Sequence, residues 1–394
     1  MKHAFDDFLV DRSALELWRG SDRISIEPLV FDLLVYLIDQ ADRVVSKEEL
    51  IDAIWNGRFV SDAAVASALR DLRRALGDDG NVQRYIRTMR GRGVRFVAPL
   101  VPIGQAPENT PDTEMAAPDQ SIRFCRSHDG TRIAYAMSGD GPPLLKTGHW
   151  LTHLEFDWES PVWRHVNSGF SETHRLVRYD GRGNGLSEWD VSDFSLTRQV
   201  EDLEAVADAA GLCRFPILGV SQAAAFSIVY AAKHPERVSK LILYAGYEKG
   251  WRQRGDEEKI KSVEAMLTLM ENQWSGSIAV AELISATYMP DAPPDHWQWF
   301  SDIQRRSTTG INAAALLQAL GNIDVQPFLS EVKAPTLVLQ GRNDGVVPLE
   351  CGQNLAAGIP NAQFVGLDTR NHILHAGDPA WSQVLKLCRE FLAD

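Results

Sequence analysis

A proline-rich stretch around residue 110 divides this chain into two parts. It contains almost no large apolar side chain, and its prolines stand among Gly, Asn, Thr, Glu and Asp at Pro102, Pro107, Pro111 and Pro118. Such a composition cannot bury enough apolar surface to fold, so it predicts a flexible tether. With 394 residues, the chain is also too long for a single ordinary core. We therefore expect one domain over residues 1–100, a linker over 101–120 and a second domain over 121–394.

The negative charge of the chain is concentrated in its second part. The net charge is −13, although residues 1–100 hold 15 Lys and Arg against 16 Asp and Glu and are nearly neutral. An acidic surface repels the phosphate backbone. We therefore expect only the first part to bind nucleic acid.

The sequence lacks targeting, membrane and metal signals. No basic and apolar leader stands at its start, and no apolar run reaches the roughly 18 residues that span a bilayer. The four cysteines are scattered, without the spacing of metal ligands. We expect a cytoplasmic protein with no membrane partner, no metal and no cofactor.

Residues 1–100 predict short strands followed by three helices. Strands are indicated over 8–10 and 14–19, and two helical segments follow them. The third helix can be capped by Ser61 or Asp62 and ends at Gly77. Its inner apolar stripe consists of Val65, Leu69, Leu72 and Leu76.

The outer face of this third helix carries small and basic side chains. Small residues let a helix approach a DNA groove, and arginines can reach guanine edges or phosphates. A hairpin with glycines at its turn follows and projects further arginines. The candidate DNA-binding residues are Ala64, Ser67, Arg70, Asp71, Arg73, Arg74, Arg90 and Arg92. For Arg73 the alternative is a pair with an acidic residue inside the domain.

These residues carry a resemblance to a known family. The helix ending in Leu72-Arg73-Arg74-Ala75-Leu76-Gly77 and the hairpin 86–96 resemble the C-terminal DNA-binding domain of response regulators, a winged helix-turn-helix, over residues 5–100. The resemblance implies that the third helix enters the major groove of double-stranded DNA while the wing rests on the adjacent minor groove or backbone. No receiver domain precedes these residues, so we expect control from elsewhere in the chain. The alternative is that the arginines only keep a small domain soluble.

Residues 122–394 alternate apolar strands with helices. Near-continuous apolar runs suit parallel strands that are buried on both faces. The pattern predicts a doubly wound, mostly parallel α/β sheet. Strands are expected at 122–127, 132–138, 144–147, 175–179, 215–218, 241–244, 336–339 and 363–367.

A serine lies where one of these strands turns into a helix. In Gly219-Val220-Ser221-Gln222-Ala223, small residues on either side of Ser221 permit a strained turn that exposes the hydroxyl above the sheet. Gly219 meets this requirement fully and Ala223 nearly. Ser221 is therefore a candidate nucleophile.

Asp344 and His372 follow later strands. The order Ser, Asp, His and the segment Tyr179-Asp180-Gly181-Arg182-Gly183-Asn184-Gly185-Leu186-Ser187 resemble the α/β-hydrolases over nearly all of the second part. The resemblance implies a catalytic triad. Ser221 would be the nucleophile, His372 the general base and Asp344 the group that orients and stabilises the imidazolium.

The oxyanion loop departs from the pattern of this family. Most relatives have a His-Gly pair after the third strand, where this chain has Lys146-Thr147-Gly148-His149-Trp150. We expect the backbone amide of His149 or Trp150 to donate to an oxyanion together with the amide of Gln222. The His149 side chain either lies over the pocket or is a plain loop residue, and we favour the second interpretation.

Between residues 246 and 328 the alternation stops and the pattern becomes helical. In this family a cap over the active site is inserted at that position. Its aromatic and flexible apolar side chains suggest a pocket for an aromatic or acyl ligand. The candidate pocket residues are Trp150, Met266, Met270, Trp274 and Trp297. The alternative for any one of them is packing of the cap onto the core.

Together the two parts predict a DNA-binding transcriptional regulator. Its hydrolase-like domain would bind, with or without hydrolysis, a small apolar or aromatic ester or lactone. The ligand would shift the geometry of a homodimer on its DNA half-sites. The alternative is an active, esterase-like serine hydrolase with an accessory DNA-binding domain, which a complete triad favours. A third hypothesis is a scaffold that only binds proteins, and no feature of the sequence supports it.

Overall fold

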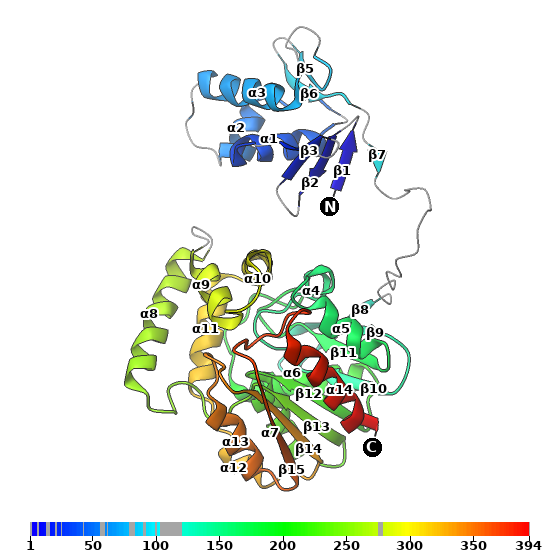
Figure 1. Ribbon diagram of the computed structural model, residues 1–394, viewed down its shortest axis with the longest axis vertical. Helices are drawn as coiled ribbons and strands as arrows, with labels where there is room; N and C mark the ends of the chain where they lie inside the picture. The colour runs from blue at the N-terminus through cyan, green and yellow to red at the C-terminus, as the bar shows by residue number, and fades with distance from the viewer. Residues whose placement is uncertain are drawn as a thin grey trace. The chain divides into compact units, whose positions relative to one another are not determined.

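The computed structural model describes residues 2–5, 8–12, 16–19, 22–24, 26–41, 43–55, 60, 62–78, 83–89, 92–98, 101–102, 120–274 and 279–393. The chain forms two units, Met1–Glu114 and Met115–Asp394 (Figure 1). The division falls inside the stretch expected to be a linker, of which residues 103–119 lie outside the described residues. The start of that stretch is a strand, β7 (Val101–Pro102), which pairs with β1 (Lys2–Phe5). The expected linker therefore begins too early.

The first unit is an α+β domain (Figure 1). An antiparallel sheet in the order β4-β3-β2-β1-β7 is accompanied by three helices and a two-stranded hairpin. The other elements are β2 (Phe8–Asp11), β3 (Glu16–Arg19), β4 (Asp22–Ile24), α1 (Pro28–Asp39), α2 (Lys47–Trp55), α3 (Asp62–Leu76), β5 (Ile86–Met89) and β6 (Gly93–Phe96). The prediction of a winged helix-turn-helix domain is confirmed.

A single apolar core holds the helices and the hairpin of this domain together. Leu72 on α3 and Phe96 on β6 belong to it and are buried. The buried carboxylate of Asp78 lies where α3 leads into β5 and accepts hydrogen bonds from the backbone amides of residues 84–86 at 2.7, 3.1 and 2.9 Å. This carboxylate therefore sets the path of the chain from the helix into the hairpin.

The second unit is built on an eight-stranded sheet in the order β15-β14-β13-β12-β10-β11-β9-β8. Strands β10 to β15 run parallel to one another, and β9 and β8 continue the sheet antiparallel at one edge. The strands are β8 (Ser121–Arg126), β9 (Arg132–Ser138), β10 (Pro143–Lys146), β11 (Arg175–Tyr179), β12 (Phe215–Val220), β13 (Val238–Tyr244), β14 (Thr336–Gly341) and β15 (Ala362–Leu367). The predicted doubly wound α/β fold is confirmed.

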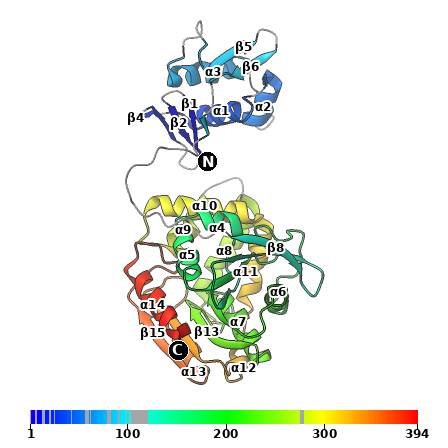
Figure 2. The same cartoon turned by 90° about the vertical axis from the view of Figure 1, so that its right-hand side faces the viewer.

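Helices cover both faces of this sheet. On one side lie α5 (Arg164–Ser171) and α14 (Pro379–Ala393), and on the other lie α6 (Leu196–Ala209) and α7 (Ala223–Lys233) (Figure 2). Every residue of β14 is buried between these layers. Double burial explains why the central strands have continuous apolar runs in place of an alternating pattern. Among the described residues, the second unit also contains α4 (Leu154–Glu159), α12 (Gln326–Leu329) and α13 (Leu349–Gly358).

A helical cap is inserted between β13 and β14. It consists of α8 (Glu257–Gln273), α9 (Ala279–Tyr288), α10 (Pro294–Ser307) and α11 (Gly310–Gly321), within the range expected for it (Figure 1). Helix α8 packs on α11, and α9 packs on α10. A bridge between Lys249 and Asp324 joins the two chain segments where the cap leaves the sheet. Within the described parts of the chain, every helix is too short or too polar to cross a bilayer.

Candidate functional site

Ser221 occupies a strained turn between β12 and α7. Its φ angle is +56°, in the left-handed region that side chains rarely adopt. Its backbone amide donates to the carbonyl of Tyr244 on the neighbouring strand at 2.9 Å, which fixes the turn to the sheet. A Cβ atom on Gly219 would come within 2.7 Å of Ser227 Oγ and 2.9 Å of Ala224 Cα. Only glycine at position 219 therefore lets the helix approach the strand this closely.

The structure brings Ser221, His372 and Asp344 together in one hydrogen-bonded chain. His372 Nε2 lies 2.9 Å from Ser221 Oγ, and His372 Nδ1 lies 2.7 Å from Asp344 Oδ2. The other oxygen of Asp344 accepts the backbone amides of Val346 and Val347 at 2.8 and 3.1 Å, which holds the carboxylate in position. With Nδ1 donating to the carboxylate, Nε2 is free to accept the serine proton.

The loop that carries His372 is held by the cap. The backbone amides of His372 and Ile373 both donate to the carbonyl of Tyr288, the last residue of α9, at 2.8 and 3.1 Å. The Tyr288 ring also meets the imidazole edge to face, with 5.1 Å between ring centroids. A change in the position of α9 would therefore be transmitted to the imidazole. Spacing along the sequence gave no sign of this contact, because it joins residues that are far apart in the chain.

The amides expected to face an oxyanion are those of Gln222, His149 and Trp150. In the described parts of the chain, none of these three amides donates a hydrogen bond within the protein. The His149 side chain lies away from the serine cavity, 4.2 Å from the ring of Trp163, with Nδ1 3.2 Å from the Trp150 carbonyl oxygen. Burial lowers its pKa well below the ordinary range, so the ring is neutral.

A cavity of about 270 Å³ lies between Ser221 and the cap. Side chains of the sheet loops, of α8, α9 and α11, and of the segment before α8 enclose it. Its lining consists of Trp150, Ser221, Gln222, Tyr247, Trp251, Arg254, Lys259, Ser262, Val263, Met266, Leu283, Ile284, Thr287, Tyr288, Leu317, Leu320, Val346 and Val347. Its volume approaches the lower end of the range of about 300 to 1,000 Å³ found for small-molecule sites.

Two of the five predicted pocket residues, Trp150 and Met266, line this cavity, and three do not. The end of α8 packs against Gly310 at the start of α11, where the absence of a side chain leaves room for the backbone carbonyl of Met270 and the side chain of Trp274. The Trp274 indole donates to the carbonyl of Thr308 at 3.1 Å. The Trp297 indole donates to the carbonyl of Met289 at 2.6 Å. Met270 is fully buried in the apolar core, and both indoles donate to backbone carbonyls of the cap, so the expectation that these three side chains face the ligand is corrected.

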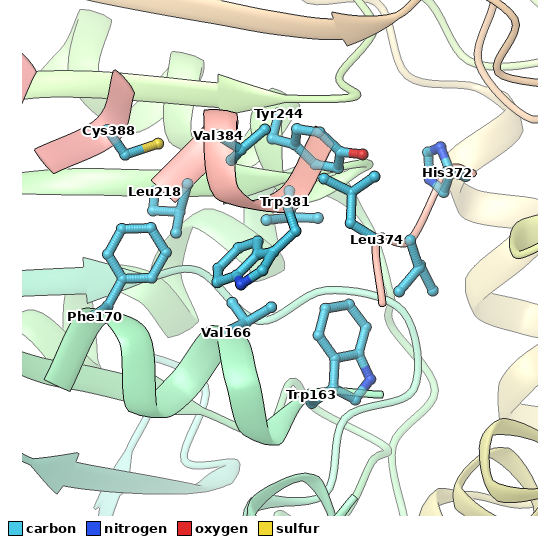
Figure 3. A pocket seen from close by; sticks show the side chains of 12 residues that line it. Trp163, Val166, Phe170, Leu218, Tyr244, His372, Leu374, Trp381, Val384 and Cys388 are labelled. Carbon is cyan, nitrogen blue, oxygen red and sulfur yellow. The ribbon is translucent and has the colours of Figure 1, made fainter. Parts of the chain in front are cut away.

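A second, smaller cavity lies beyond His372, between the sheet and two helices (Figure 3). Its volume is about 40 Å³ and its walls are apolar, so it is too small for a ligand and has few partners for water. The labelled side chains around it are Trp163, Val166, Phe170, Leu218, Tyr244, His372, Leu374, Trp381, Val384 and Cys388. We interpret it as a packing defect between α5, α14 and the sheet.

The candidate DNA-binding residues on α3 lie along one side of the helix. Arg70 and Arg74 are exposed, while Ala64, Ser67 and Asp71 are half-buried. The Asp71 carboxylate accepts hydrogen bonds from Arg74 Nη1 at 2.8 Å and from the Ser67 hydroxyl at 3.4 Å. These contacts leave both arginine side chains accessible from solvent.

The remaining three candidates differ from one another. Arg92 is exposed at the hairpin, and Arg90 lies outside the described residues. Arg73 Nη2 donates to the Ile86 carbonyl at 3.0 Å and to the Thr88 hydroxyl at 2.9 Å. Arg73 therefore joins α3 to β5, and its partners are a carbonyl and a hydroxyl in place of the acidic residue considered from the sequence.

Among the described residues, no three His, Cys, Asp or Glu side chains form a group that could hold a metal ion. The site of this domain consists of the serine turn, the imidazole, the carboxylate and the cavity under the cap.

Comparison with known proteins places both units in families. Residues 21–96 match the family of C-terminal domains of transcriptional regulatory proteins. The chain is 34% identical over 120 residues to HilA, a transcriptional regulator of Salmonella typhi; the match covers 30% of this chain and 21% of HilA. The chain thus spans about a fifth of the length of that relative.

Most of the second unit is matched by known proteins. The chain is 25% identical over 247 residues to the AB hydrolase superfamily protein YisY of Bacillus subtilis, covering 59% of this chain and 86% of YisY. The crystal structure of the enol-lactonase from Burkholderia xenovorans LB400 superposes with a TM-score of 0.58 at 21% identity, covering 69% of this chain and 100% of the lactonase. Residues 156–379 match the alpha/beta hydrolase fold family. The chain therefore belongs to the α/β-hydrolase family and carries, ahead of its hydrolase domain, a winged-helix DNA-binding domain of transcriptional regulators.

Proposed function

We propose that the protein is a DNA-binding transcriptional regulator whose hydrolase domain binds a small apolar or aromatic ester or lactone. The observation that carries the proposal is the presence, in one chain, of an arginine-bearing α3 and of a capped cavity of about 270 Å³ that ends on Ser221. A hydrolase acting on free metabolites has no evident need of a winged helix. A ligand-responsive regulator needs both a DNA-binding domain and a ligand-binding site.

DNA contact would be made by α3 in the major groove, with Arg70 and Arg74 toward bases or phosphates. Arg92 and Arg90 of the hairpin would contact the neighbouring backbone or minor groove. Two copies acting as a homodimer would read two half-sites, as paired winged helices do on palindromic operators.

The ligand would act through the cap. It would contact α8 and α9, and the last carbonyl of α9 holds the loop of His372 at 2.8 Å. A ligand that favours one position of α9 shifts the population toward that position. We propose that the two positions differ in the arrangement of the homodimer and hence in DNA affinity.

A second candidate function is serine hydrolysis, favoured by the hydrogen-bonded chain of Ser221, His372 and Asp344. Ser221 Oγ would attack the ester carbonyl while His372 Nε2 takes its proton. The amide of Gln222, together with that of His149 or Trp150, would stabilise the oxyanion. The imidazolium would then protonate the leaving alcohol. A water molecule, deprotonated by His372, would then attack the carbonyl of the acyl-enzyme. The acid would leave, and the imidazolium would return its proton to Ser221 Oγ. Both functions can belong to one protein, as a sensor that removes its own signal.

The regulatory proposal is tested by gel retardation of DNA from upstream of the protein's own gene. We expect the full-length protein to retard such a fragment, and we expect a hydrophobic ester or lactone to change the affinity. Failure to retard any upstream fragment, with and without added esters, would contradict it.

The hydrolytic proposal is tested with a fluorophosphonate probe. Labelling of wild-type protein that disappears in Ser221→Ala supports chemistry at this serine. Absence of labelling would leave the domain as a receptor without turnover.

A further inference from the structure

Two cationic side chains line the cavity above Ser221. Arg254 belongs to the segment that leads into the cap, and Lys259 belongs to the first turn of α8. Both are half-buried. Most of the other lining side chains are apolar or aromatic, and no acidic side chain lines the cavity among the described residues. The cavity therefore combines a nucleophile, an apolar wall and two positive charges without a negative one.

The Arg254 guanidinium has neutral partners. Its Nη1 lies 3.4 Å from Cys351 Sγ, and its central carbon lies 5.5 Å from the centre of the Tyr247 ring. Burial raises the pKa of the Cys351 thiol, so the sulfur carries no charge at neutral pH. The charge of the guanidinium is therefore left uncompensated by these two contacts.

Acidic residues occur near this end of the cap. Glu248 and Glu350 lie close enough to Cys351 to contribute to its raised pKa, and one carboxylate oxygen of Glu248 is buried without a hydrogen-bond partner, but neither residue lines the cavity. Glu248, buried earlier in the same segment, accepts Asn354 Nδ2 at 2.8 Å. Asp256 caps α8 by accepting the Lys259 backbone amide at 3.0 Å, and its side chain is exposed. Within the described parts of the chain, neither Arg254 nor Lys259 has an ion-pair partner within 4.0 Å.

A half-buried cation beside an apolar cavity is costly unless an anion meets it. The guanidinium of Arg254 offers two parallel N–H groups that match the two oxygens of a carboxylate. The ammonium of Lys259 can donate a further hydrogen bond to the same carboxylate. A carboxylate on the ligand would supply the missing charge. The apolar wall between the cations and Ser221 would receive a hydrocarbon chain or ring.

We propose that the cavity takes an acyl ester or lactone whose acyl part ends in a free carboxylate, bound by Arg254 and Lys259 while the ester carbonyl lies at Ser221. This inference rests on the proposed function, since it places the ligand in the same cavity, and it narrows the ligand class from a neutral ester to an acid-bearing one. The cations hold one end of the ligand, and the serine turn holds the other.

The test compares two probes on full-length Ser221→Ala, which cannot form an acyl-enzyme. Mono-p-nitrophenyl adipate and p-nitrophenyl hexanoate have acyl chains of equal length and differ in a terminal carboxylate against a methyl group. Binding is followed by quenching of tryptophan fluorescence, because Trp150 and Trp251 line the cavity. We expect the adipate ester to bind at least about tenfold more tightly, as a charge-assisted contact implies.

The preference should depend on the two cations. In Ser221→Ala combined with Arg254→Gln and Lys259→Gln, we expect it to fall to within about twofold. Arg252→Gln is the matched control: Arg252 lies 4.4 Å above the Trp251 ring and 3.6 Å from Glu264, and it does not line the cavity. This control should keep the preference. Equal binding of both esters, binding of neither, or a preference that survives the loss of both cations would overturn the inference.

Turnover by the wild-type protein separates this inference from the hydrolytic proposal. Equal hydrolysis of both esters would support a hydrolase and overturn the carboxylate site. Binding selective for the adipate ester, without turnover of either, would support the carboxylate site and contradict hydrolysis.

Discussion

The Asp344 carboxylate lies 2.7 Å from His372 Nδ1, and both side chains are only 1% exposed. Water therefore has little access to this hydrogen bond, and the protein alone sets the orientation of the ring. Ser221 Oγ lies 2.9 Å from the opposite nitrogen. The arrangement leads to a direct prediction about the carboxylate.

Asp344→Asn should remove turnover while leaving the fold intact. The amide has the same shape, but it can present an N–H to Nδ1 and force the wrong tautomer on the ring. We expect kcat for p-nitrophenyl hexanoate to fall by about 10⁴-fold. Asp368→Asn makes the same chemical change at an exposed position after β15 and should keep the wild-type rate. Undiminished turnover in Asp344→Asn would exclude the proposed role.

Arg70→Ala with Arg74→Ala should abolish specific DNA binding. Both side chains are exposed on α3, and each contact with a base is worth about 1 to 3 kcal/mol. Gel retardation with an upstream fragment, repeated at several salt concentrations, measures the loss. Arg12→Ala is a control in the same domain, because Arg12 pairs with Asp39 inside it. Retention of wild-type affinity by the double variant would count against α3 as the DNA-reading helix.

Arg73→Ala should mainly lower the stability of the winged-helix domain. It removes hydrogen bonds of 3.0 Å to the Ile86 carbonyl and 2.9 Å to Thr88 Oγ1, and thereby the link between α3 and the hairpin. We expect the free energy of unfolding of the winged-helix domain to fall by about 1 to 2 kcal/mol. Arg74→Ala, whose side chain is 73% exposed, should change stability by less. Thermal melts of both variants measure the difference. Equal melting temperatures for Arg73→Ala and Arg74→Ala would refute the structural role of Arg73.

Gly219→Ala should disturb the serine turn. The added methyl group would lie 2.7 Å from Ser227 Oγ, so α7 would have to move away from β12. We expect a destabilisation of about 1 to 3 kcal/mol and a slower reaction of Ser221 with a fluorophosphonate. Gly345→Ala is the matched control, since a Cβ atom there meets nothing within 4 Å. Labelling at the wild-type rate in Gly219→Ala would show that the close approach is not required.

His153 should make stability depend on pH. Burial lowers its pKa from 6.5 to about 4, and its Nδ1 accepts the Phe156 amide at 3.4 Å as the cap of α4. The unfolded chain binds the proton at higher pH than the folded one. The contribution of this residue is therefore full above pH 6.5 and is lost as the pH falls toward 4.

The test of this pH dependence is His153→Asn, which retains a capping side chain without the titration. Between these pH values, its unfolding free energy should fall less steeply than that of the wild type, by at most about 1 kcal/mol per pH unit. Denaturant unfolding at a series of pH values measures both slopes. Identical slopes would contradict the assignment.

Much of the fold was predictable because its signals are local. The apolar stripe of α3 repeats at helical spacing, and the central strands are short apolar runs whose double burial follows from their composition. The turn at Gly219 and Ser221 is also local, since the demand for small residues arises within a few positions of the serine. These features depend on neighbours in the chain.

Pairings between distant segments were not predictable. Strand β7 joins β1 across about a hundred residues, whereas the composition around it predicts the start of a linker. The sequence is compatible with Arg73 as a DNA contact or as a member of an internal ion pair, whereas its actual partners on β5 exist only because the hairpin folds against α3.

The two domains, the serine turn and the order of Ser221, Asp344 and His372 follow from the amino-acid sequence alone, because spacing along the chain specifies each of them. Which cap side chains reach the cavity depends on how the helices pack in three dimensions. Met266 and Met270 stand one helical turn apart on α8, yet the first lines the cavity and the second is fully buried in the apolar core. The positions of Arg254 and Lys259 also depend on this packing, because only the folded cap places both cations in the lining of the cavity. The direction and surroundings of a side chain depend on the packing of elements that are distant in sequence, which no local pattern contains.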